Sequence, residues 1–461
     1  LCLAKCFASM LTVPLLAPLL HNSLNTCALQ RVHVLALTSQ EERRKVEFEE
    51  TLFEALLQTE GVHSAVSLDA AVSDKGRGLV AKRSVEAGES LLVIPEALLL
   101  TAHRSGIVGG LVGQTDLMFD AAGDLREEVG AERFSQGQTW DVRLALAVFE
   151  ATAGGCGGSF WDQYRRLLPL PPFLATSLCL PAPLLAQLHD PVLEKISESK
   201  KALLSRSFPA LGDHIVHPAT AVYLQAGAPA QTIPLPLFWA YALVVSRCFA
   251  MSDGDTFAFV PFLDMAQHAE KPSANFASTA EGFELTALRP LHKGEDVTIS
   301  YDRDEYNSRR MFELYGFAPE LGTARDAELL AEALVLYSEI GAPVDSVAPR
   351  KISTADIQPL LAAFDAHKGS EYSSKPRLAA IYDALTADEA PDVARMLESV
   401  RWQRGEWATS LAEDLHEQQE MLQQTSGGGM GARATAVLSY RISRKKQFVL
   451  AEEVLSTFLD A

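Results

Sequence analysis

The side chains best suited to chemistry follow an apolar run, FVPFL, at residues 259–263. Asp264, Gln267, His268 and Asn275 come directly after it. A buried polar group costs roughly 1–3 kcal/mol unless it is paired. These side chains therefore either bond one another or meet a ligand. Taken singly, each has an ordinary explanation, because a lone histidine is commonly a satisfied core or surface residue and Asp and Asn are frequent turn formers.

A second candidate is the segment GRGLVA at residues 76–81, which matches the dinucleotide-binding pattern G-x-G-x-x-[GA]. That pattern needs a helix directly after it to receive the pyrophosphate. Here KRSVEAGESLLVIP follows, which predicts strand, turn and strand. We therefore reject a dinucleotide site. Two glycines flanking one residue still allow the backbone to approach a ligand closely.

Tyr301 closes a third segment, the strand-like run DVTISY. Alone it would be read as half-buried packing with its hydroxyl on a partner. No Ser or Cys stands in a nucleophile-elbow motif and no carboxylate pair is distinctive, so covalent catalysis is not indicated. The six cysteines include no C-x-x-C pair, which predicts neither a zinc site nor a disulfide framework, and we expect a reducing intracellular compartment.

The composition is that of a globular protein with two or three domains. The 461 residues are 48% hydrophobic and 21% charged, and the formal net charge is −19. So acidic a chain has no evident surface for nucleic acid, and a basic protein or peptide fits better as a partner.

The first forty residues differ from the rest, because they contain no Asp or Glu and carry the apolar run MLTVPLLAPLL. The run is too short, and too interrupted by proline, to span a bilayer. We expect an organelle transit peptide here; a secretory h-region and a disordered leader are the alternatives.

Periodicity divides the remainder. Residues 41–61 have helical spacing, and short strand-like runs with turn residues follow from Val62. From about Leu98 to Arg247 the pattern is mostly helical. Strand character returns between residues 257 and 301, and helices are predicted from about Leu321 to the end.

One pattern, R-x-[VL]-x-x-G-E, occurs at residues 83–89 and again at 289–295, each time before an apolar strand. The two copies are either ordinary hairpin turns or the matching halves of a single β-domain. The second interpretation requires a long helical insertion between the halves, which then return to pair.

Five segments occur in order along the chain: KGRGLV, SRCF, DMAQH, ALRPLHKGEDVTISY and ELYGF. This set resembles the SET-domain protein methyltransferases, in the branch similar to the Rubisco large-subunit lysine methyltransferase. The resemblance extends from about Val62 to the C-terminus. It implies an α+β fold in which a SET β-fold with a pseudoknot is split by a helical insertion and followed by an all-α domain.

Composition, periodicity and the resemblance together divide the chain into five expected regions. They are a leader or transit peptide (1–40), an N-terminal helix with the first part of the SET domain (41–101), a helical insertion (102–245), the second part of the SET domain with the active site (246–320), and a helical substrate-binding domain of the Rubisco-methyltransferase type (321–461).

The resemblance also assigns roles to residues. Tyr301 matches the catalytic tyrosine, and Arg247 lies where the branch has an arginine near cofactor and substrate. Asp264–His268 would pass through a neighbouring loop in the pseudoknot, and Tyr315 and Phe317 would wall the pocket and the target-lysine channel. The expected cofactor-binding residues are Lys75, Gly76, Arg77, Gly78, Arg247, Asp264, Gln267, His268, Tyr315 and Phe317, with no metal.

Two positions depart from the family pattern. Gln267 stands where the family has Asn, which adds one methylene next to the expected adenine contact. Asn307 lies eight residues before Tyr315, where the family usually has seven, so the loop after Tyr301 carries an extra residue.

The function that the resemblance implies is that of an S-adenosylmethionine-dependent protein-lysine N-methyltransferase acting on a non-histone protein. Two alternatives are a protein-histidine N-methyltransferase of the same fold and a SET-like interaction module with weakened catalysis. We expect a monomer with a protein substrate and neither nucleic acid nor membrane as partner. A chloroplast location is expected first, and a cytoplasmic or nuclear one otherwise.

Overall fold

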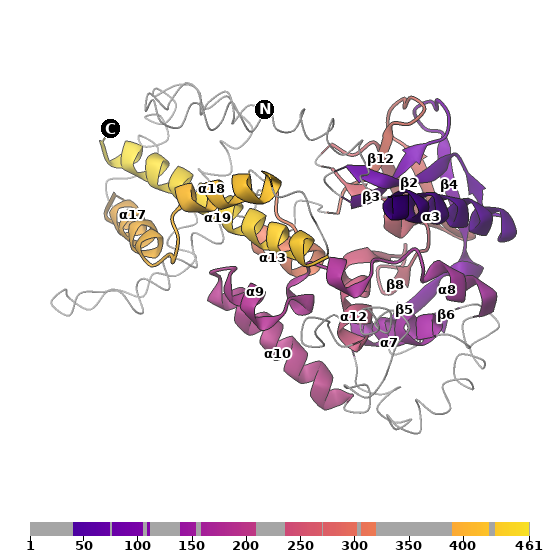
Figure 1. The fold of residues 1–461 in the computed structure, drawn as a ribbon, viewed down its shortest axis with the longest axis horizontal. Coiled ribbons are helices and arrows are strands. Elements are labelled where there is room, and N and C mark those ends of the chain that lie inside the picture. Colours follow the sequence, from indigo (N-terminus) through magenta and orange to yellow (C-terminus); the bar gives the residue numbers. More distant parts are fainter. Residues whose placement is uncertain are drawn as a thin grey trace. The chain divides into compact units, whose positions relative to one another are not determined.

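The computed structural model describes residues 40–73, 76–104, 108–110, 139–153, 158–208, 236–269, 271–301, 306–319, 390–423 and 429–460. These residues fall into two compact units (Figure 1). The β-rich unit comprises the described residues up to 182 together with 195–301, and the helical unit comprises 183–194 and those from 306 onward. Within the described ranges, no helix is both long and apolar enough to cross a membrane.

The strands of the β-rich unit form three four-stranded sheets in the described part of the chain. The first has the order β1 (His63–Ser64), β4 (Ser90–Pro95), β11 (Gly282–Ala287) and β10 (Ala274–Thr279). The second has the order β2 (Val66–Ser73), β3 (Gly76–Ala81), β12 (Asp296–Ile299) and β9 (Gln267–His268). The third has the order β6 (Val108–Gly110), β5 (Leu100–His103), β8 (Thr256–Phe259) and β7 (Cys248–Ala250).

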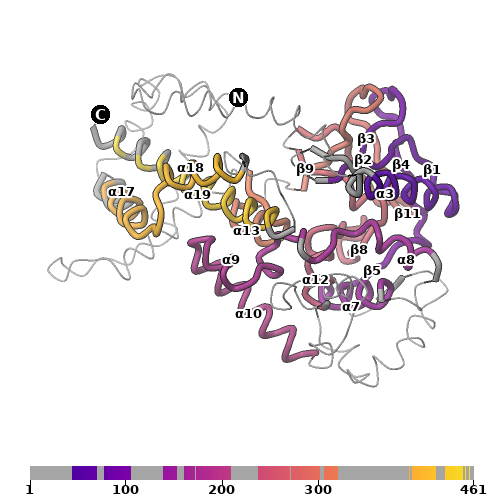
Figure 2. Tube along the Cα trace, viewed as in Figure 1, coloured from indigo at the N-terminus to yellow at the C-terminus, as the bar shows by residue number. Residues whose placement is uncertain are grey.

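Each sheet joins strands from both ends of the β-rich unit. Figure 2 shows β4, from the early part of the chain, beside β11, from the late part, and the two pair antiparallel with Leu92 opposite Leu285. β12 also pairs antiparallel with β3. The prediction of one β-domain whose halves return to pair is therefore confirmed.

The repeated R-x-[VL]-x-x-G-E turns have the same structure. In both copies the arginine pairs with the glutamate six residues on, and the glycine has a positive φ, +83° at Gly88 and +80° at Gly294. Gly88 N–H donates to Ala287 O and Gly294 N–H donates to Ala81 O. The two turns are thus equivalent by an approximate two-fold relation, which the sequence pattern indicated.

Helices cover these sheets. Helix α3 (Gln40–Thr59) lies beside β2 in Figure 1 and buries Phe53, Leu56 and Leu57, the apolar positions of the predicted helix. Three helices of the insertion complete the core of this unit: α7 (Trp140–Ala153), α8 (Gly158–Tyr164) and α12 (Pro236–Arg247).

The prediction that residues 98–247 are mostly helical is wrong at its start. β5 spans Leu100–His103 and pairs with β8, and β6 spans Val108–Gly110. A short apolar run such as LLLTA fits a buried strand as well as a buried helix, so periodicity could not distinguish the two. Strand β5 also crosses the boundary expected at residue 102.

The helical unit contains α13 (Ser308–Tyr315), α17 (Ala390–Gly405), α18 (Leu411–Gln423) and α19 (Gly429–Asp460) among the described residues. Residues 183–194 belong to the same unit; they include most of helix α9 (Ala182–Ala186) and the start of α10 (Pro191–Ser207). The helices expected after residue 321 are confirmed where the structure describes them, and the segment 320–389 lies outside the described residues.

Buried ion pairs connect the elements of the helical unit. Asp190 is fully buried and accepts hydrogen bonds from Arg309 Nε at 2.9 Å and the Tyr440 hydroxyl at 2.6 Å, and Arg444 also pairs with it. Burial pushes the pKa of Asp190 upward, but the two guanidinium charges and the tyrosine hydrogen bond outweigh it and lower the pKa to about 2.

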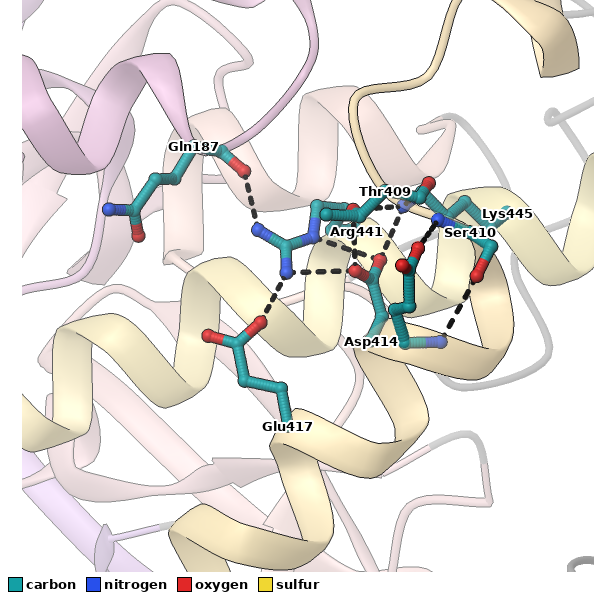
Figure 3. Close-up of polar contacts among 8 residues, drawn as sticks. Gln187, Thr409, Ser410, Asp414, Glu417, Arg441 and Lys445 are labelled. Carbon is teal, nitrogen blue, oxygen red and sulfur yellow. Dashed lines mark hydrogen bonds and ion pairs between the residues drawn. The ribbon is translucent and has the colours of Figure 1, made fainter.

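A second buried carboxylate, Asp414 of α18, is held by α19 (Figure 3). Arg441 donates to it at 2.9 Å and Lys445 at 2.6 Å, while Thr409 donates at 2.7 Å. Arg441 also reaches Glu417 at 2.6 Å. A buried charge without a partner is costly, so these contacts specify the register of α19 against α18.

Candidate active site

Tyr301 lies directly beyond the point where β9 and β12 run parallel, with Gln267 opposite Thr298 and His268 opposite Ile299. Its backbone N–H donates to His268 Nδ1 at 3.1 Å, and its hydroxyl donates to the Ala266 carbonyl at 2.6 Å. Because Nδ1 is the acceptor, a neutral His268 ring carries its proton on Nε2. Tyr301 is thus fixed at both ends by the segment that begins at Asp264.

The Tyr301 hydroxyl remains protonated at neutral pH. Burial raises its pKa to about 12; the Arg247 charge lowers the pKa and the Asp264 charge raises it. Since the proton is donated to Ala266, the oxygen can meet a ligand only as an acceptor.

Asp264 is the centre of the polar cluster. It is buried, and its Oδ2 accepts a hydrogen bond from Arg247 Nη1 at 3.0 Å. The same nitrogen donates to the Asp264 carbonyl at 2.7 Å. Oδ1 accepts from the Tyr164 hydroxyl. Burial raises the pKa of Asp264, although the Arg247 charge opposes that shift.

Gln267 connects this cluster to the glycine-rich start of β3. Its Nε2 donates to the Arg77 carbonyl at 2.5 Å. Gly78 makes room for the side chain, since a Cβ there would lie 3.3 Å from Gln267 Cγ. The Arg77 guanidinium binds Glu49 of α3 at 3.0 Å, with the Glu49 side chain only 8% exposed. The start of β3 is therefore held from both sides.

The structure brings together most of the predicted site residues. Those in the β-rich unit are linked by the contacts above or lie next to such a residue in β3: Gly76, Arg77, Gly78, Arg247, Asp264, Gln267, His268 and Tyr301. Tyr315 and Phe317 lie in the helical unit, with ring centroids 6.1 Å apart, and their place in a pocket stays a prediction. Lys75 lies outside the described residues.

One polar residue does not join the cluster. Asn275 is exposed on β10, where it lies opposite Thr286. Of the polar residues that follow the apolar run 259–263, Asp264, Gln267 and His268 therefore belong to the cluster, whereas Asn275 is a surface residue.

Two partners of the cluster were not predicted. Tyr164 lies at the end of α8 and Glu49 in α3, and each reaches a residue far away in the sequence. Helical spacing in FWDQYRRLL and EERRKVEFEE placed them on helices, but no local signal pointed to Asp264 or Arg77 as their partner.

Comparison with known proteins shows which proteins this chain resembles. Residues 76–302 match the SET domain family. Human SET domain-containing protein 4 is 24% identical over 276 residues, covering 57% of this chain and 56% of that protein. Human N-lysine methyltransferase SETD6 is 25% identical over 289 residues, covering 57% of this chain and 52% of that protein.

The third comparison is with a plant enzyme. The chloroplastic ribulose-1,5 bisphosphate carboxylase/oxygenase large subunit N-methyltransferase of Pisum sativum is 22% identical over 273 residues, covering 57% of this chain and 50% of that protein. The chain spans about half the length of the curated relatives it matches.

Solved structures agree on the fold. Rubisco LSMT bound to AdoMet superposes with a TM-score of 0.51 at 16% identity, covering 89% of this chain and 92% of that chain. The SET domain of LSMT bound to lysine and AdoHcy gives a TM-score of 0.50 at 16% identity, covering 88% and 91%.

The fold agrees with the match of residues 76–302 to the SET domain. Residues 76–302 form a SET domain, and the chain resembles the branch of the Rubisco large-subunit methyltransferase. The resemblance stated from the sequence motifs is therefore confirmed, as is its α+β fold with a helical C-terminal region.

Proposed function

We propose that this chain is an S-adenosylmethionine-dependent protein-lysine N-methyltransferase that acts on a non-histone protein. The observation that carries the proposal is the fixed, protonated Tyr301 hydroxyl, tied by Ala266 and His268 to the segment that begins at Asp264. Relatives named as N-lysine methyltransferases support the assignment.

The residues present fit the cofactor. Its amino-acid end carries a carboxylate, and the described residues engage only Nη1 of the Arg247 guanidinium, which has five N–H donors. Gly76 and Gly78 of β3 have no side chains, so the backbone there can approach a ligand closely, although the Gln267 side chain takes part of the space at Gly78. When bound, the cofactor would supply an electrophilic methyl group on a sulfonium.

Tyr301 would orient the reactants rather than remove a proton. With a pKa of about 12 its phenolate is scarce at neutral pH. The hydroxyl oxygen, whose hydrogen bonds the Ala266 carbonyl, would accept weak C–H···O contacts from the methyl group and a hydrogen bond from the incoming amine. Positioning of this kind can supply up to roughly 7–11 kcal/mol of the barrier.

The target lysine must lose its proton before it can attack, because its ordinary pKa is near 10.4. An apolar environment disfavours the ammonium form and lowers that pKa. We assign this role to the aromatic walls expected at Tyr315 and Phe317.

The test is transfer of labelled methyl from S-adenosylmethionine into a lysate, with the modified residue identified by mass spectrometry. The proposal expects a labelled lysine on a non-histone protein, lost with Tyr301→Phe. Labelled histidine instead would establish the histidine alternative. Cofactor binding without any labelled protein, in lysates of the source organism from several tissues, would favour the interaction module.

We also propose a chloroplast location, supported by the acid-poor first forty residues and by the plant relatives named as chloroplastic. The test is a fusion of residues 1–40 to a fluorescent protein in leaf protoplasts. Import into plastids is expected, and a fusion that stays in the cytosol contradicts the proposal.

A further inference from the structure

A residue outside the SET motifs controls the backbone that leads into the site. Tyr164 ends α8 in the helical insertion and is fully buried. Its hydroxyl accepts the Phe262 backbone N–H at 2.6 Å and donates to Asp264 Oδ1. One oxygen atom therefore holds two positions of the segment between β8 and β9.

The residue that it holds is in a costly conformation. Phe262 has φ +70° and ψ −48°, in a region that bulky residues rarely adopt. Such backbone costs on the order of 1–3 kcal/mol and persists only where its surroundings enforce it. Phe262 is fully buried against Phe53 and Tyr164, with ring centroids 5.3 and 5.4 Å away.

This strained turn sets the direction of the chain between Leu263 and β9. A single 3-10 turn, Leu263–Met265, comes next, and then β9 with Gln267 and His268. Both Asp264 oxygens are used, Oδ1 by Tyr164 and Oδ2 by Arg247. The tyrosine therefore fixes the plane of the carboxylate that in turn fixes the Arg247 guanidinium.

We propose that Tyr164 is a positioning residue for the cofactor site. Its hydroxyl enforces the Phe262 turn and orients Asp264 toward Arg247, so that the insertion helix α8, and not the SET strands alone, sets the affinity for the cofactor. The inference rests on the proposed function, because it supposes that Arg247, Gln267 and His268 meet S-adenosylmethionine.

The chain offers a matched control. Tyr241 is also buried in the β-rich unit and also donates its hydroxyl proton to an aspartate, Asp141. Tyr241→Phe removes the same atom and the same kind of hydrogen bond away from the Asp264 cluster. The two variants therefore separate a general loss of stability from a specific loss of positioning.

The experiment measures the melting temperature, the S-adenosylmethionine Kd by calorimetry, and the KM for that cofactor. We expect both variants to lower the melting temperature, Tyr164→Phe by more, because it also leaves the buried Phe262 N–H without its acceptor. The Kd and KM should rise about tenfold only in Tyr164→Phe, as for the loss of a hydrogen bond to a charged group. Equal Kd values for wild type and Tyr164→Phe, or an equal rise in Tyr241→Phe, would overturn the inference.

A double variant tests the route through Asp264. Residues that act through one another give non-additive effects. Tyr164→Phe combined with Asp264→Asn should weaken cofactor binding by less than the sum of the two single losses. Additive losses would show that Tyr164 does not act through Asp264.

A further measurement needs no variant and keeps the test intact if Tyr164→Phe does not fold. Amide exchange of Phe262 in the wild-type chain should slow when S-adenosylmethionine is added, together with that of residues 264–268. Exchange at Phe262 that the cofactor leaves unchanged would contradict the inference. A wild-type chain that binds no cofactor would instead remove the proposed function itself.

Discussion

Val85 and Leu291 exchange a pair of backbone hydrogen bonds, each 3.0 Å long, from the two ends of the split domain. They occupy the same position of the repeated R-x-[VL]-x-x-G-E pattern. The two copies therefore meet at their centres, and the approximate two-fold relation joins the halves that the helical insertion separates.

The two turn glycines should be equally sensitive to substitution. Gly88 and Gly294 have φ near +80°, and a Cβ would meet nothing within 4 Å at either, so the cost is backbone strain alone. We expect Gly88→Ala and Gly294→Ala each to lower the free energy of unfolding by about 1–2 kcal/mol. Denaturant titration measures it.

The control for this prediction is Gly431→Ala. Gly431 lies in α19, and a Cβ there also meets nothing within 4 Å. Alanine is favoured over glycine inside a helix, so this variant should be neutral or stabilising. A loss of stability at all three glycines would contradict the assignment of the cost to positive φ.

The helical unit should lose stability in acid through Asp190. Its pKa in the folded chain is about 2, below the ordinary value of 3.8, so the unfolded chain takes up the proton first. The stabilisation, about 2 kcal/mol, is fully present above pH 4–5 and is lost as the pH falls through the folded pKa. Unfolding followed between pH 6 and pH 2 measures it.

Asp190→Asn is the matched variant. It leaves Arg309 and Arg444 buried without the carboxylate, which should cost about 3–5 kcal/mol at neutral pH. It should also remove the acid-dependent part of the stability. An unchanged pH profile in Asp190→Asn would show that another carboxylate is responsible.

Gln267 should be better than asparagine in this chain. Its amide reaches the Arg77 carbonyl over Gly78, and asparagine is one methylene shorter. We expect Gln267→Asn to lose this tie and to raise the Kd for S-adenosylmethionine several-fold, by roughly the worth of one hydrogen bond. Tighter cofactor binding by Gln267→Asn, measured by calorimetry, would mean that Gln267 is instead a weakening departure from the family pattern.

The pH dependence of the rate should show no tyrosine ionisation. The pKa of Tyr301 is about 12, so kcat is expected to rise with pH as the target lysine loses its proton and to show no second break below about pH 11. Tyr301→Phe should lower kcat ~100-fold or more while leaving that pH dependence in place. A break near pH 8–9 that disappears in Tyr301→Phe would contradict the role of a protonated hydroxyl.

The sequence predicted those features that local pattern decides. The spacing of Phe53, Leu56 and Leu57 predicted α3, and the repeated Gly-Glu turns predicted strands that return to pair. The ordered motifs predicted the SET fold and placed Tyr301 and Asp264 in a single site. Each of these signals lies within a few residues of the chain.

Contacts between distant segments could not be predicted in the same way. Tyr164 and Asp264 come from different elements, and the aromatic spacing of α8 would serve a packed core equally well. The bond from Gln267 to Arg77 depends on how β9 and β3 flank β12. In the first pair the sequence named only Asp264; in the second it named both residues, but the contact between them came from the fold.

The most direct measurement is calorimetric titration of S-adenosylmethionine into the wild-type chain and Tyr301→Phe. Our account predicts saturable binding of one cofactor by each, with Kd values within a few-fold, because the cluster around Asp264 holds the cofactor and Tyr301 acts in the transfer. Absence of binding by the wild-type chain would contradict the account at its centre.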